Sequence, residues 1–153
     1  QSGRKRKILM KISTKGRYGL RALVDLAGHD NGEPIALASI AQRQKLSLNY
    51  LEQVFSVLRK AGIVKSLKGV NGGYRLAKKA DDITVKEVLE VLEGKFSIVD
   101  EYAQEKGTDD VQEAIKTLVW DQINTRVNQL LEEKTLKQLM ASFADENRKQ
   151  KSI

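Results

Sequence analysis

The sequence contains no cysteine and a single histidine, His29, among its 153 residues. The chain therefore forms no disulfide and offers no thiolate nucleophile and no cysteine ligand for an iron–sulfur centre. A lone histidine also argues against a zinc site built from a histidine cluster, so we expect no metal and no cofactor. One proline and 5% aromatic residues favour a mostly helical chain over a β-sandwich.

Long apolar runs are missing as well. No stretch approaches the roughly 20 residues that a membrane-spanning helix needs, and no signal-peptide pattern is present. We therefore expect a cytoplasmic protein without membrane contact. Residues 1–3 are typical of the remnant of a cleaved purification tag, and the cationic run over 4–7 is typical of a basic extension.

Charge is abundant, and the two halves of the chain differ in its sign. Residues 1–79 carry 17 basic and 4 acidic side chains, a net charge of +13, whereas residues 80–153 carry 10 basic and 16 acidic ones, a net charge of −6. A basic half joined to an acidic half indicates that one part faces a polyanion and the other has a different role. Nucleic acid and an anionic membrane surface both fit the basic half at this point.

The basic half has the pattern of a helix-turn-helix. Ser13 is a good N-cap for a first helix with a stripe of apolar side chains. A short second helix is expected over 37–43. Ser47 then caps a third helix over 48–60, which ends at Gly62. Two short helices joined by a tight turn are typical of this DNA-binding motif.

A β-hairpin is predicted directly after the third helix. Residues 63–67 and 74–76 have strand character, and the glycines of the segment 69–73 are expected to adopt positive φ in a turn. These glycines lack the strand–GxxxxGKS/T–helix context of a nucleotide-binding loop, so we disfavour that alternative. The hairpin therefore predicts the wing of a winged helix, with Lys68 at its tip. The cations beside the tip are Lys65, Arg75, Lys78 and Lys79.

Two capping boxes mark helices in the acidic half. Thr84 and Glu87 are expected to exchange hydrogen bonds with each other's backbone amides and to start a short helix that ends at Gly94. Thr135 and Gln138 form a second box, which starts a last helix reaching to about residue 144. Between these helices we expect a loop over 95–109 and a long helix over 110–133.

The long helix carries more apolar surface than a small winged domain can cover alone. It could pack back on its own domain, but we favour an interface between two copies, because helix-turn-helix proteins place two recognition helices on a palindromic site. Trp120 is accordingly expected to be buried or at an interface. The predicted dimerisation residues are Val111, Ile115, Leu118, Val119, Ile123, Val127 and Leu130.

These elements predict a mainly α fold with a small β-hairpin, that is, a winged helix-turn-helix plus a long dimerisation helix. No catalytic constellation emerges, because His29 has no serine, cysteine or carboxylate partner pattern and is expected to pack at a helix end; we therefore expect no enzyme. The expected division is a tag remnant and basic extension over 1–9, a winged helix-turn-helix domain over 10–80, a helical dimerisation and regulatory region over 81–145, and a tail over 146–153.

The third helix presents side chains that can read base edges. Asn49, Glu52 and Gln53 project from its first two turns, opposite the apolar stripe. Asparagine and glutamine pair with adenine, and glutamate accepts from cytosine. On an isolated helix these residues would be an ordinary solvated face, but the preceding helix and the following hairpin favour base recognition.

Three segments, in this order, resemble the Rrf2 family of bacterial transcription regulators. They are residues 10–20 (MKISTKGRYGL), 46–53 (LSLNYLEQ) and 69–76 (GVNGGYRL). The resemblance covers about residues 10–94, and the remainder matches in layout only. It implies a bacterial, homodimeric winged-helix repressor that binds double-stranded DNA at palindromic operators.

The resemblance also implies roles for single residues. It places Asn49, Glu52 and Gln53 in the major groove. It places Tyr50 on a phosphate and Lys68 near the minor groove. The full set of predicted DNA-contacting residues is Lys15, Arg17, Ser47, Asn49, Tyr50, Glu52, Gln53, Arg59, Lys68, Asn71 and Tyr74.

One departure from the family narrows the resemblance. Cluster-binding members carry three cysteines in the loop that corresponds to 95–107, where this sequence has none. The cysteine-free pattern resembles the CymR branch, whose repressors of cysteine metabolism respond through complex formation with O-acetylserine sulfhydrylase.

Two alternatives remain: a small-molecule-responsive regulator with a pocket between the winged domain and the long helix, and an interaction adaptor without DNA binding. The presence of Gln53 and Lys68 argues against the adaptor.

Overall fold

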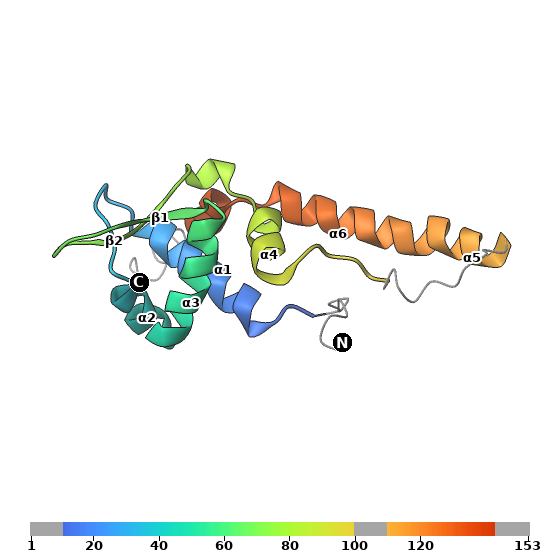
Figure 1. Ribbon diagram of the computed structural model, residues 1–153. Helices are drawn as coiled ribbons and strands as arrows, with labels where there is room; N and C mark the ends of the chain where they lie inside the picture. Colours follow the sequence, from blue (N-terminus) through green and yellow to red (C-terminus); the bar gives the residue numbers. More distant parts are fainter. Residues whose placement is uncertain (1–10, 100–109, 143–153) are drawn as a thin grey trace, which may run out of the picture.

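The computed structural model describes residues 11–99 and 110–142 (Figure 1). The expected tag remnant and basic extension, the end of the 95–109 loop and the tail over 146–153 lie outside the described residues. A helical body with a β-hairpin at one side carries one long helix that extends away from it. The structure confirms the predicted fold class, mainly α with a small hairpin.

The order of the elements follows the prediction closely. The first part contains α1 (Thr14–Gly28), α2 (Leu37–Gln44), α3 (Leu48–Lys60), β1 (Val64–Leu67) and β2 (Gly73–Leu76). A 3₁₀ turn (Ala80–Asp82) leads to α4 (Val85–Glu93). The long helix consists of α5 (Asp110–Ile115), a π-helical segment (Lys116–Trp120) and α6 (Asp121–Glu133), and a last helix covers 136–142 within the described residues.

Serine side chains cap the helices that they were predicted to cap. Ser13 Oγ accepts a hydrogen bond from the amide of Lys15 at 3.2 Å, and Ser47 Oγ accepts one from the amide of Tyr50 at 3.2 Å. Lys45 caps the carboxyl end of α2, and its left-handed conformation (φ 58°) produces the tight turn before α3. The helix-turn-helix is thus formed by local signals that the sequence already contains.

The two capping boxes differ in outcome. In the second box, the Thr135 amide donates to Gln138 Oε1 at 3.0 Å and the Gln138 amide donates to Thr135 Oγ1 at 3.2 Å, as predicted. In the first box, the Glu87 amide donates to Thr84 Oγ1 at 3.0 Å. The prediction for the Glu87 carboxylate is wrong, because it accepts from Lys78 Nζ at 2.7 Å instead. A charge-assisted hydrogen bond to an ammonium group is stronger than one to a neutral amide.

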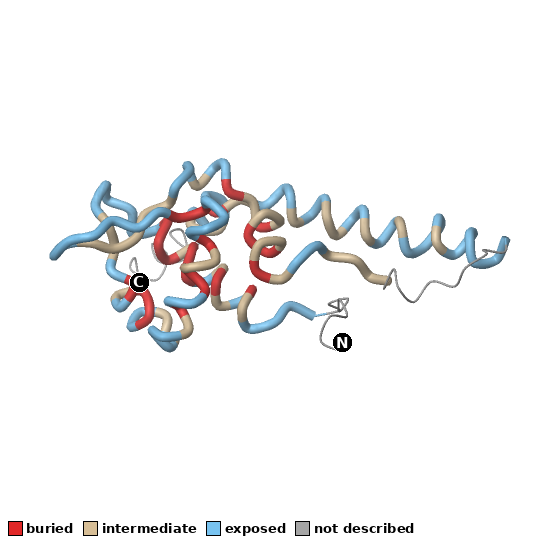
Figure 2. Tube along the Cα trace, viewed as in Figure 1, coloured by how far each residue is buried: buried red, intermediate tan, exposed pale blue. Residues whose placement is uncertain are grey.

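The core joins the basic N-terminal half to α4 and to the last helix. Leu23 of α1, Phe55 of α3, Val88 of α4 and Leu136 of the last helix are each fully buried in one cluster (Figure 2). The amide of Leu136 donates to the carbonyl oxygen of Ile83 at 3.0 Å. The chain therefore returns from the long helix to the body, and the last helix begins against it.

The long helix does not pack back on its own domain, so the alternative considered from the sequence is wrong. The carboxyl-terminal part of α6 contacts α4, but none of the residues 110–133 is buried (Figure 2). Trp120 is 38% exposed and Leu118 is 71% exposed in the single chain. An exposed apolar face of this extent indicates an interaction surface.

A π-helical segment within the long helix was not predicted. Four residues turn an α-helix by about 400°, so a stripe of side chains spaced by four drifts about 40° at each step. The wider turn of a π-helix offsets part of this drift. It therefore helps to hold on one face the apolar residues spaced by four, which are Val111, Ile115, Val119, Ile123 and Val127.

Candidate nucleic-acid interface

The outward face of α3 carries the predicted base-reading residues. Asn49, Glu52 and Gln53 are all exposed, and together with Ser56 they line one shallow hollow in the surface. The opposite face of α3 is buried in the core. The three side chains therefore reach solvent side by side, as the spacing predicted. Ser47 and Arg59, at the two ends of this helix, are exposed as well.

The N-terminal turns of α1 lie beside the start of α3 and hold Tyr50. The Tyr50 hydroxyl lies 3.3 Å from Thr14 Oγ1, and its ring packs edge-on against Tyr18 with 6.1 Å between centroids. The Arg17 guanidinium lies over the Tyr18 ring at 5.5 Å. Lys15, in the same turn of α1, is half-buried. Three predicted DNA-contacting residues, Lys15, Arg17 and Tyr50, of which Tyr50 was expected on a phosphate, thus lie close together beside the start of α3.

An acidic residue closes the N-terminus of α1, and sequence reasoning missed it. Glu93 Oε2, in the last turn of α4, accepts from the amide of Gly16 at 2.6 Å and from the Ser13 hydroxyl. A carboxylate at this position is stabilised by the positive end of the dipole of α1. A Cβ on Gly16 would collide with Glu93, and one on Gly19 would collide with Leu92. Two glycines three residues apart in a helix are the sequence signal for such a close neighbour.

The turn of the wing needs its glycines for two different reasons. Gly69 adopts a φ of +118°, as predicted for this turn. The expectation of positive φ is wrong for Gly72 and Gly73. A Cβ on Gly72 would collide with the carbonyl oxygen of Leu67, and one on Gly73 would collide with that of Ile35. Close approach between backbone segments, and not backbone dihedral angle, requires these two glycines.

The predicted wing cations fall into two groups. Lys65, Lys68 and Lys79 are exposed and take part in no ion pair within the described residues. Arg75 instead pairs with Asp30 at 3.2 Å, and Lys78 pairs with Glu87. The positive charge that the wing offers to a polyanion is therefore concentrated at its tip and its exposed edges.

Two further predicted contact residues lie in the same hairpin. Asn71 is exposed in the turn. Tyr74 is half-buried, with its ring edge-on to Phe55 at a centroid distance of 5.1 Å. Its backbone also pairs with Ile35, which ties β2 to the segment before α2. Tyr74 thus anchors the wing to the body, and its contact with DNA stays a prediction.

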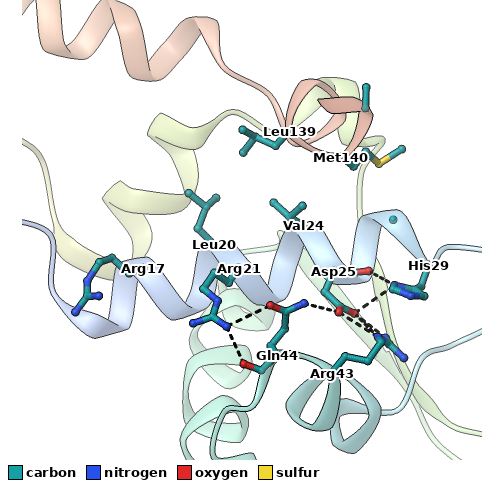
Figure 3. Close-up of a pocket in the computed structure, with 12 residues that line it drawn as sticks. Arg17, Leu20, Arg21, Val24, Asp25, His29, Arg43, Gln44, Leu139 and Met140 are labelled. Atoms are coloured by element: carbon teal, nitrogen blue, oxygen red, sulfur yellow. Dashed lines mark hydrogen bonds and ion pairs between the residues drawn. The ribbon is translucent and has the colours of Figure 1, made fainter. Parts of the chain in front are cut away.

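A buried carboxylate fixes α2 against α1 (Figure 3). The side chain of Asp25 is 1% exposed and accepts from Arg43 Nη2 at 2.6 Å, from Arg43 Nε at 3.1 Å and from Gln44 Nε2 at 2.8 Å. The hydrogen bond to Asp25 raises the pKa of Arg43 above its ordinary value. His29 Nδ1 lies 2.8 Å from the Asp25 carbonyl oxygen and 3.4 Å from its carboxylate. The expectation that His29 lacks a carboxylate partner is therefore wrong.

No helix within residues 11–99 and 110–142 is long and apolar enough to cross a membrane.

A family model described as "Rrf2: Iron-dependent Transcriptional regulator" matches residues 12–142. The residues of this chain do not fit the iron that this description implies. The whole sequence has no cysteine, and the described part brings together no three histidine, cysteine, aspartate or glutamate side chains that could hold a metal ion.

Relatives extend over nearly the whole described chain. The chain is 44% identical over 136 residues to the HTH-type transcriptional regulator CymR of Bacillus subtilis. This alignment covers 89% of this chain and 93% of the relative. It is 40% identical over 134 residues to the regulator IscR of Vibrio atlanticus, with 86% and 75% covered.

A solved structure agrees with these sequence relatives. The fold superimposes on CymR, "the Global Cysteine Regulator of B. subtilis", with a TM-score of 0.75, 41% identity, and coverage of 88% of this chain and 98% of the other. These relatives are transcriptional regulators and not enzymes. With a matching family model over 12–142 and relatives aligned along most of their length, the chain belongs to the Rrf2 family of transcriptional regulators.

Proposed function

We propose that the chain is a sequence-specific repressor that binds palindromic operators as a homodimer. The observation that carries the proposal is the exposed, polar face of α3, where Asn49, Glu52 and Gln53 line one hollow. The hairpin of the wing follows directly after this helix. Amide and carboxylate side chains on a helix of this kind pair with base edges in the major groove. An interaction adaptor would need none of these three side chains exposed together.

Phosphate contacts would flank this reading helix on both sides. Lys15, Arg17 and Tyr50 lie at its N-terminal side, and the exposed Lys68 and Asn71 lie in the wing. Contacts to phosphates set the register of a protein on the duplex but carry no sequence information. Hairpin side chains can also enter the narrow minor groove. The arrangement supports base recognition by α3 with positioning from α1 and the wing.

The dimer would form through the apolar face of α5, the π segment and α6. Val111, Leu118 and Leu130 are 66%, 71% and 53% exposed in the single chain. Pairing two such faces around a two-fold axis buries them and fixes the distance between the two copies of α3. Recognition helices of such dimers lie about 34 Å apart, one turn of the DNA helix, on successive major grooves.

Substitutions in α3 and in the wing are expected to differ in kind. Gln53→Ala should weaken binding to the operator by about 1–3 kcal/mol and relax discrimination at one base pair, because it removes a base contact. Lys68→Ala should weaken binding evenly across sequences and lower the salt slope by about 0.9, because it removes one phosphate contact. Fluorescence anisotropy of labelled operator and scrambled duplexes, titrated with salt, measures both effects.

Lys137→Ala is the matched control for the lost charge, since Lys137 is exposed on the last helix, away from α3 and the wing, and pairs with Asp81 across 3.6 Å. It should leave DNA affinity unchanged. Wild-type affinity in both Gln53→Ala and Lys68→Ala would contradict the winged-helix mode of binding.

The regulon and the regulating partner form the finer part of the proposal. Similarity to a CymR described as a global cysteine regulator supports a role in cysteine and sulfur metabolism. Without cysteine, the chain has no thiol switch of its own, so its signal comes from a bound molecule or protein. The residues from 80 onward carry a net charge of −6, opposite in sign to that of the basic half, and are the candidate region for such a partner. By resemblance, the partner is O-acetylserine sulfhydrylase.

Addition of the purified sulfhydrylase is expected to shift the affinity for operator DNA by about 5–150-fold, the usual range of coupling between sites. A partner acts only if it binds the two states of the regulator differently. O-acetylserine, the substrate of the enzyme, should reverse the shift. If neither addition moves the DNA titration, a directly bound small molecule becomes the better account of regulation.

A further inference from the structure

A groove of about 1030 Å³ runs along α1 between the helix 136–142 and α2 (Figure 3). Leu20 and Val24 of α1 point towards Leu139 and Met140 of the last helix across the open space. All four side chains are half-buried. Pockets that bind small molecules usually have volumes of about 300–1,000 Å³ and mostly apolar walls. The groove therefore has the size and the lining of a ligand site.

The apolar wall on α1 is elongated. Leu20, Val24 and Gly28 recur at every fourth residue, so they lie along one side of the helix. From the first to the third of them the helix rises about 12 Å. Gly28 has no neighbour within 4 Å of a Cβ position, so this end of the groove is open. The shape suits an extended apolar chain better than a compact ring system.

The other edge of the groove, towards α2, is polar and carries an excess of positive charge. Its charged lining residues are Arg17, Arg21, Arg43 and Asp25, three cations against one anion. The Asp25 carboxylate is already satisfied by Arg43 and Gln44. Arg21 donates to the carbonyl oxygen of Gln44 at 2.7 Å through one nitrogen only, and its side chain is exposed. A guanidinium has five N–H donors, so Arg21 retains donors for an anion.

We propose that this groove binds a small organic anion with an extended alkyl chain, that is, a medium-chain carboxylate. The alkyl chain lies between the Leu20/Val24 wall and the Leu139/Met140 wall, and the carboxylate accepts hydrogen bonds from Arg21 at the polar edge. The charge of the lining discriminates against neutral and cationic amphiphiles of the same length. A ligand in this position contacts both the helix-turn-helix and the helix that returns from the long helix.

One consequence concerns DNA and rests on the proposed function. Arg17 lines the groove and is also predicted to contact a phosphate. A carboxylate bound near Arg17 competes with that phosphate for the same cation. Saturation of the groove is therefore expected to weaken operator binding, and the groove is a regulatory site.

The test is titration of the full ¹⁵N-labelled chain, in its native oligomeric state, with sodium decanoate. We expect saturable shifts of the amides of Leu20, Val24 and Leu139, and no saturable shift with decanol or decylammonium. Arg21→Gln should weaken decanoate about tenfold, because it removes a hydrogen bond to a charged group. Arg126→Gln removes an exposed arginine from α6 and should leave decanoate binding unchanged.

Val24→Trp fills the groove from its apolar side and should abolish decanoate binding while the circular dichroism spectrum stays native. Equal binding of decanol and decanoate, or shifts confined to residues 110–133, would overturn the proposal. A loss of dimer mass in Val24→Trp would also overturn it, because a second copy of the chain would then occupy the groove. The spectra report on the ligand alone, so failure to bind operator DNA would contradict the proposed function and not this site. Unchanged operator affinity at saturating decanoate would overturn the regulatory role.

Discussion

Ile123→Asp is expected to convert the protein from a dimer into a monomer and to abolish binding to a palindromic operator. Ile123 is 36% exposed in the single chain, so the substitution leaves the fold of the monomer intact. In the proposed dimer the same position is covered, and an uncompensated charge there costs several kcal/mol. Sedimentation velocity measures the mass, and anisotropy on a full palindrome and on a half-site measures the DNA affinity.

Thr125→Asp is the matched control for this experiment. Thr125 is exposed and lies two residues further along α6, about 200° around the helix from Ile123. It adds the same charge outside the apolar stripe and should remain dimeric with native affinity. If Ile123→Asp itself stays dimeric and binds the palindrome normally, the subunits meet elsewhere.

Arg43→Met is expected to lower the free energy of unfolding by about 3 kcal/mol, the low end of the range for breaking a buried ion pair. Without the guanidinium, the Asp25 carboxylate, whose side chain is 1% exposed, keeps the neutral donor Gln44 and the neighbouring His29 but loses its charged arginine partner. The low end applies because the Arg43 side chain is 36% exposed and water can reach its position. Urea denaturation followed by circular dichroism measures the loss.

Two comparisons separate the buried pair from a surface one. Adding Asp25→Asn to Arg43→Met should recover much of the lost stability, because no charge is then left unpaired. Lys78→Met breaks the pair with Glu87, whose two side chains are 39% and 34% exposed, and should cost less than about 1 kcal/mol. Equal losses in Arg43→Met and Lys78→Met would show that Asp25 is not held by Arg43 in solution.

The elements of the basic half follow from spacing within short segments. The Ser13 and Ser47 caps join atoms only two or three residues apart, so the sequence contains the whole interaction. Because an α-helix has 3.6 residues per turn, the positions of the buried stripe of α3 require that Asn49, Glu52 and Gln53 face solvent. The same helical periodicity locates the exposed apolar stripe of the long helix, although the partner that covers this stripe is not part of a single chain.

Pairings between distant segments do not follow from spacing. Glu87 has the position of a capping-box residue but turns to Lys78, and Glu93 caps α1 from α4. Asp25 lies on a helix that the sequence predicts, yet nothing in the sequence marks Arg43 as its partner. A carboxylate binds whichever cation or amide the fold brings within about 3 Å, and this depends on how helices pack.

The glycines of the wing show both kinds of cause in one turn. Gly69 is required by its own positive φ, a local property that the turn pattern predicts. Gly73 is required by the carbonyl oxygen of Ile35, a residue that precedes α2 and meets β2 only in the folded chain. The sequence by itself determined which helices and strands form and which faces they expose, because those depend on neighbours along the chain. The tertiary structure alone decided which charges pair and where the groove beside α1 stays open, because both depend on distances between segments that are separated along the chain.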